Sequence, residues 1–177
     1  NNADGGGLYI VKTRGTADGQ STIVQNNDEL GYINFRGADG TDGNTNAATI
    51  RAFCDGAPGS NDMPGRLVFS TTADGASSAT ERLRITSSGK IGINNASPTF
   101  AAGGGVHLKG SGTDFTSYRV TASSNTGVDF SQASDGKGYV YNRDNADLIV
   151  GTNNTERLRI SSTAVSYTHL RAHETST

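Results

Sequence analysis

The chain has 177 residues, a net charge of −2 and a pI near 5.9, so it lacks the basic footprint of a nucleic-acid-binding protein. Only 33% of the residues are hydrophobic and 24 are Gly, so one chain can build little core. The single cysteine, Cys54, excludes a disulfide framework and a C-x-x-C motif, and no apolar run approaches the about 18 residues of a membrane helix.

Strand-length runs separated by turn signals follow one another along the chain. Asp-Gly, which supplies positive φ to tight turns, occurs at 4, 18, 39, 42, 55, 74 and 135. The first half holds such runs at 7–13, 21–25, 30–37, 47–54, 65–72, 81–86 and 90–94. Several alternate with period two, and no segment keeps helical spacing. We therefore expect an all-β fold of short antiparallel strands and hairpins.

The pattern restarts after Pro98 and a Gly-rich segment. Further runs lie at 106–110, 117–123, 127–132, 138–143, 147–152 and 155–161, and the hexapeptide TERLRI recurs at 80–85 and 155–160. We predict a module at 1–98 that ends in the TERLRI and KIGIN strands, a joint at 99–105, and a shorter module at 106–164 that ends in TERLRIS. Modules that each bury only part of their own surface are stabilised by neighbours, so we expect contacts along the chain or across an oligomer to complete the fold.

The sequence that follows the second TERLRI copy differs from the sequence that follows the first. The string VSYTHLRAHET at 165–175 resembles a translated sequencing-library adapter. We interpret 165–177 as an artefact and not a domain, and exclude His169 and His173, which have the i, i+4 spacing of helical metal ligands. Because the chain begins without Met, we expect it to be a fragment of a longer protein.

No catalytic or cofactor-binding constellation emerges, so we expect a protein that is not an enzyme. The remaining histidine is His107. A Ser-His-Asp catalytic site would also need a nucleophile, and the chain contains no G-x-S-x-G motif. The acidic stretch at 37–44 offers Asp39, Asp42 and Asn44 as oxygen ligands for calcium, but it lacks the spacing and the glutamate of an EF-hand loop. We prefer a solvated turn there, with Asp-Gly carboxylates capping their own turns.

The repeated hexapeptide supplies candidate inter-chain residues. Period two places Leu83 and Ile85 on one side of a strand, with Arg82 and Arg84 on the other. One interpretation is a polar outer face whose exposed ion pairs contribute about 0–1 kcal/mol each. The other is that Arg82 or Arg84 pairs with a carboxylate of a neighbouring chain and fixes the register between chains. The candidates are Glu81, Arg82, Leu83, Arg84, Ile85, Glu156, Arg157, Leu158, Arg159 and Ile160.

These motifs carry a family resemblance over residues about 7–163. The phrase DMPGRLVFSTTADG, followed by TERLRI and SGKIGI, resembles repeated modules of tail fibre and related structural proteins of marine tailed bacteriophages. The stretch YVYNRDNADLIVGTNNTERLRISS resembles a second module type of the same proteins. The resemblance implies a homotrimeric fibre segment on a virion, involved in host attachment. Its partners would be other virion tail proteins and a host-surface glycan or protein, and no cofactor is implied.

Two alternatives stay open. The same modules fit a bacterial or prophage-derived extracellular adhesin. A tailspike that cuts host polysaccharide would need paired carboxylates about 5–10 Å apart on a concave surface.

Overall fold

The computed structural model describes residues 5–100, 103–110, 116–121 and 126–163. The chain divides into two compact units, Asn1–Ser111 and Gly112–Thr177. The regular structure of the described residues is β throughout, which confirms the predicted all-β class. That part of the chain contains no helix able to cross a membrane. The adapter-like stretch at 165–175, with its two histidines, lies outside the described residues.

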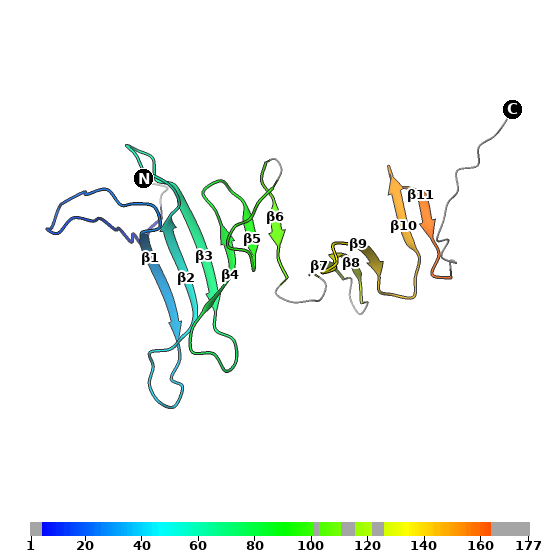
Figure 1. The fold of residues 1–177 in the computed structure, drawn as a ribbon, viewed down its shortest axis with the longest axis horizontal. Helices are drawn as coiled ribbons and strands as arrows, with labels where there is room; N and C mark the ends of the chain where they lie inside the picture. The colour runs from blue at the N-terminus through cyan, green and yellow to red at the C-terminus, as the bar shows by residue number, and fades with distance from the viewer. Residues whose placement is uncertain (1–4, 101–102, 111–115, 122–125, 164–177) are drawn as a thin grey trace. The chain divides into compact units, whose positions relative to one another are not determined.

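The first unit contains a six-stranded sheet whose spatial order follows the chain order (Figure 1). The first five strands are antiparallel to their neighbours, and the sixth runs parallel to the fifth. The strands are β1 (Glu29–Arg36), β2 (Asn46–Cys54), β3 (Gly65–Thr71), β4 (Thr80–Ile85), β5 (Ile91–Ile93) and β6 (Val106–Leu108).

Turn glycines set the hairpins of this sheet. Gly40 in the β1–β2 loop and Gly75 in the β3–β4 loop have φ of 93° and 75°. Both loops lie at the same end of the sheet (Figure 1). Gly89, with φ of 74°, turns the chain between β4 and β5, and its N–H donates to the carbonyl of Thr86 at 2.9 Å. The turns predicted at Asp-Gly are therefore confirmed at Gly40 and Gly75, because only residues tolerant of positive φ fit them.

One face of the sheet is apolar across all six strands. Residues paired across strands share a face, and two complete rows of paired residues on this face are apolar. We call them together the apolar face. The first row is Gly31, Ala52, Leu67, Ile85, Ile91 and Val106, and the second is Ile33, Ile50, Phe69, Leu83, Ile93 and Leu108.

The apolar face is left open within the chain. Ile33 is 45% exposed and Val106 51%, and no residue of the two rows is fully buried. Among the buried side chains of the central strands, Thr49, Val68 and Ser70 lie on the opposite face, which we call the polar face, whereas Cys54 at the end of β2 lies on the side of Ala52. The fully buried apolar residues of the described chain are Val24, Cys54 and Val68. The prediction that one chain builds little core is confirmed. Most of the apolar side chains of the sheet lie on the apolar face and are not buried within the chain.

The two N-terminal runs predicted as strands, 7–13 and 21–25, form no strands in the structure. They are joined by Arg14 N–H to Thr22 carbonyl at 3.1 Å and by the Thr13 hydroxyl to the same oxygen at 3.0 Å. A strand needs a continuous ladder with a neighbour, and these segments have none within the chain. The side chain of Ile10 lies against Gly31, where an added Cβ would come within 2.3 Å of it.

The boundary between modules also differs from the prediction. Segment 106–110 was expected to open the second module, but Val106–Leu108 is β6 of the first sheet. The N–H of Ile91 donates to the Gly105 carbonyl at 2.9 Å, and the N–H of Lys109 donates to the Ile93 carbonyl at 3.0 Å. The described residues of the predicted joint, 99–100 and 103–105, therefore belong to the connection between β5 and β6 in the first unit, because a parallel neighbour requires the chain to return to the same end. The units divide after Ser111 instead.

The second unit repeats the same inverted burial on a smaller scale. Across its three-stranded sheet, Tyr118, Phe130 and Val140 pair on one face and are 59%, 53% and 50% exposed. Asp129, on the other face, is only 1% exposed. The strands of this unit are β7 (Thr116–Val120), β8 (Val128–Gln132) and β9 (Gly138–Asn142), followed by the hairpin of β10 (Leu148–Thr152) and β11 (Thr155–Ile160).

Candidate functional site

The TERLRI repeat forms the second strand of a hairpin in each unit, as predicted. β3 and β4 are joined by residues 72–79, whereas β10 and β11 are joined by Asn153 and Asn154 alone. Both asparagines have positive φ, 51° and 55°, as the central residues of a tight I′ turn require. The second turn is therefore shorter than the first.

A β-bulge occurs at the same place in both hairpins. Phe69 pairs with Leu83, but the next residue of β3, Ser70, pairs with Glu81, so Arg82 is the extra residue. In the second hairpin the register also shifts, and Arg157 is the extra residue. Strict alternation would place Glu81 on the side of Leu83. The bulge turns Glu81 to the polar face, beside Arg84.

The bulge creates a two-pronged ion pair within each strand. Arg84 donates from Nε and Nη2 to the two carboxylate oxygens of Glu81 at 2.7 and 2.6 Å. This hydrogen bonding raises the pKa of Arg84 above its ordinary value, against a smaller lowering by burial. Arg159 likewise donates from Nε and Nη2 to the two carboxylate oxygens of Glu156. The carboxylate partner of each arginine is thus supplied by its own strand, a relation that the recurrence of Glu three residues before Arg in both copies could have indicated.

The other two arginines of the repeat also bond within their hairpins. Arg82 Nε donates to Thr71 Oγ1 at 3.1 Å, and Arg157 Nε donates to Thr152 Oγ1 at 2.9 Å. Both contacts are exposed. A single chain does not test whether Arg82 reaches a neighbouring chain, so that pairing stays a prediction.

An aspartate outside the repeat completes the arrangement in each unit. Asp55 accepts the N–H of Ser87 at 2.9 Å, and Asp147 accepts that of Ser162 at 2.9 Å. Ser87 and Ser162 hold the same place after the two TERLRI copies. Sequence reasoning missed this link because the two aspartates stand at different distances from the repeat.

The apolar residues of the repeat lie on open faces. Leu83 pairs with Phe69 and Ile93 within the apolar face. In the second hairpin Leu158 is 54% exposed and Ile160 49%. The predicted split between apolar and arginine sides is therefore confirmed for Leu83, Ile85 and Arg84 by their pairing partners.

The acidic loop is bonded to itself. Asp39 accepts the N–H groups of Thr41 and Asp42 at 2.8 and 3.1 Å, and its second oxygen accepts the Thr45 hydroxyl at 3.2 Å. Asp42 accepts the N–H of Asn44 at 2.7 Å. The predicted capping of turns by Asp-Gly carboxylates is confirmed here, and the same bonds lower the pKa of Asp39. Within the described residues no group of three or more His, Cys, Asp or Glu is placed to hold a metal ion.

His107 stabilises the crossover to β6. Its Nδ1 accepts the N–H of Thr99 at 3.3 Å, and its ring meets that of Phe100 edge-on at 6.0 Å. Both partners belong to the connection that precedes β6. The contacts of this histidine are thus those of a packing residue.

Comparison with known proteins adds no family: no protein-family model matches the chain, and no curated protein matches it. The function is inferred below from the geometry of the sheets and the resemblance carried by the motifs.

Proposed function

We propose that this chain is a structural and adhesive segment of a bacteriophage tail fibre, assembled from three identical copies through its apolar sheet faces. The observation that carries the proposal is the inverted burial in both units. Each unit leaves an apolar sheet face open, while the charged side chains of the opposite face are paired within the chain.

The size of the open surface supports self-association. Two apolar rows cross all six strands of the first sheet, and the second unit adds Tyr118, Phe130 and Val140, each at least 50% exposed. Burying the exposed half of one such side chain yields about 1 kcal/mol. Contiguous apolar patches of this kind mark interaction surfaces in soluble proteins, and a second copy of the chain offers the same apolar chemistry in return.

The polar face is suited to solvent. Glu81 and Asp129 each pair with an arginine of the same chain, Arg84 and Arg119, at 2.6 Å, so association through the apolar faces would leave both carboxylates paired. Three chains arranged around one axis with their apolar faces inward would present these polar faces outward. Such an arrangement would also cover strand edges, which otherwise invite uncontrolled pairing.

The fibre, the number three and the place on a virion rest on the resemblance of the motifs to phage tail modules. The sequence DMPGRLVFSTTADG forms β3 and the loop that follows it, and TERLRI forms β4, so the motifs of the resemblance are the hairpin that repeats in both units. Host attachment follows from the same resemblance, with a surface glycan or protein of the host as partner.

Light scattering after size exclusion tests the assembly. We expect a trimer for the full chain and for a version that ends at residue 164, which lacks the adapter-like tail. A monomer that keeps a β-type circular dichroism spectrum at micromolar concentration would contradict the proposal. Genes for capsid, terminase or baseplate proteins beside the source gene would favour a phage fibre over a bacterial adhesin.

A further inference from the structure

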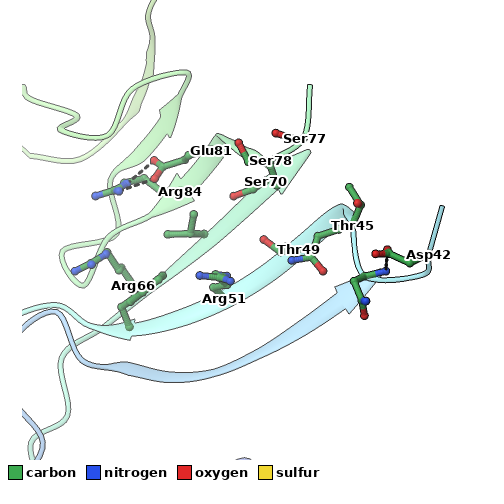
Figure 2. Close-up of a pocket in the computed structure, with 15 residues that line it drawn as sticks. Asp42, Thr45, Thr49, Arg51, Arg66, Ser70, Ser77, Ser78, Glu81 and Arg84 are labelled. Atoms are coloured by element: carbon green, nitrogen blue, oxygen red, sulfur yellow. Dashed lines mark hydrogen bonds and ion pairs between the residues drawn. The ribbon is translucent and has the colours of Figure 1, made fainter. Parts of the chain in front are cut away.

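A groove of about 590 Å³ lies on the polar face of the first sheet. Its floor is formed by β2 and β3, where Thr49 and Ser70 are cross-strand partners. Figure 2 shows Thr49 and Ser70 on two neighbouring strands, with Arg51 and the Glu81–Arg84 pair to their left. The ends of the β1–β2 and β3–β4 loops border the groove with Asn44, Thr45, Asn46, Ser77 and Ser78.

The two floor hydroxyls have no partner in the protein. Thr49 is 4% exposed and Ser70 9%, yet within the described chain neither hydroxyl makes a hydrogen bond. Among the described residues, neither hydroxyl oxygen belongs to the enclosed side-chain atoms that lack a partner, so both oxygens are reached from the groove. Thr49 and Ser70 both line the groove, so a hydrogen-bond partner for their hydroxyls would have to enter the groove.

The hairpin itself does not need the hydroxyl of Ser70. In the second copy of the repeat the corresponding residue is Gly151, which pairs with Glu156 as Ser70 pairs with Glu81. The same bulge and the same two-pronged ion pair form there without a side chain at this place. Ser70 is thus an addition to the shared hairpin, present where β2 supplies Thr49 beside it.

The arginines around the groove are paired within the chain, and Asp42 is a further carboxylate of the lining. Each lining arginine has its own carboxylate: Arg51 with Glu29 at 3.2 Å, Arg66 with Asp55 at 3.0 Å and Arg84 with Glu81 at 2.6 Å. An anion entering the groove would compete with these partners instead of meeting an open cation. The remaining lining is mostly hydroxyl and amide groups, which disfavours an apolar ligand and fits a neutral one rich in hydroxyls.

We propose that this groove binds a segment of a neutral oligosaccharide, whose hydroxyls pair with Thr49 and Ser70 at the floor. The inference rests on the proposed adhesive role and gives it a ligand class. The groove and the apolar face are on opposite sides of one sheet, so association through the apolar face leaves the groove open.

Isothermal titration of the full chain with maltohexaose, laminarihexaose and mannohexaose tests the inference, with a heparin hexasaccharide as the anionic comparison. We expect at least one neutral sugar to bind with a dissociation constant of about 1 mM or tighter. Thr49→Val and Ser70→Ala should each weaken it about tenfold, the loss of one hydrogen bond. Neither change should lower the melting temperature, because each removes an unpartnered hydroxyl. Ser131→Ala removes another buried, unpartnered hydroxyl outside the groove, and it should leave binding unchanged.

Three results would overturn the inference: no neutral sugar binds at about 10 mM, well above a millimolar dissociation constant; only heparin binds; or the double variant binds as the parent does. Light scattering on the same samples separates the two proposals. A trimer without sugar binding defeats the groove and spares the fibre, whereas a monomer whose sugar binding needs Thr49 and Ser70 defeats the fibre and supports the groove.

Discussion

Replacing Ile33 of the apolar face and Phe35, two residues further along the same side of β1, should dissociate the proposed trimer without unfolding the chain. Ile33 and Phe35 are 45% and 52% exposed in the single chain, so their serine variants remove little intramolecular packing. Burying the exposed half of each is worth about 1 kcal/mol. Three copies of both residues amount to about 6 kcal/mol, or about four orders of magnitude in the association constant.

The matched control lies on the same strand. Tyr32 is 54% exposed and pairs with Arg51 on the polar face, so Tyr32→Ser should leave the trimer intact. Mass by light scattering, measured over a concentration series, reads out the association, and circular dichroism checks the strands. The reasoning is refuted if Ile33→Ser/Phe35→Ser stays trimeric at the lowest concentrations, or if Tyr32→Ser dissociates the trimer as strongly.

The remaining predictions concern stability within each unit. Hydrogen bonds from Arg119 and a second arginine hold the pKa of the buried Asp129 below its ordinary value of about 3.9. A depressed carboxyl pKa stabilises the fold above the unfolded-state value, so the melting temperature of the second unit should fall as the pH drops below about 4. Asp129→Asn should lower that temperature at pH 7 and reduce its dependence on acid, and the other paired carboxylates of the unit, such as Asp144 and Asp147, account for the dependence that remains. In the first unit, Gly92→Ala would place a Cβ 2.1 Å from the Asn95 carbonyl oxygen, so chemical denaturation should report a loss of about 1–3 kcal/mol. Gly31→Ala meets only an exposed isoleucine side chain and should cost much less; equal losses would contradict this account.

The strands were predictable because they are encoded locally. Alternation over 81–86 and 65–72 marks strands without knowledge of their partners, and Asp-Gly and Gly89 mark turns through their tolerance of positive φ. The predictions that were wrong concern segments whose structure depends on partners distant in the sequence. Residues 7–13 have the composition of a strand but no neighbour to pair with in the chain, and the pairing of β6 beside β5 could not be foreseen from a Gly-rich stretch.

The candidate site was predictable only in part. The division of Leu83 and Arg84 between two faces follows from period two. The pairing of Arg84 with Glu81 does not, because it needs an inserted residue that alternation cannot reveal. The floor of the groove depends on the register of β2 against β3, which brings Thr49 beside Ser70 from separate strands.

The spatial order of the first sheet, β1 to β6 without exchange, also bears on how the chain folds. Each new strand needs only its immediate predecessor as a template, so loop closures are short and the search for partners is local. Hairpin formation takes about 1–10 μs, whereas the meeting of separate chains depends on their concentration. Strands can therefore form one by one as the polypeptide leaves the ribosome, and for the proposed trimer the slow step would be the encounter between finished sheets. During that interval the apolar face is exposed, so the yield of assembled protein should depend on how quickly copies made on one messenger find each other.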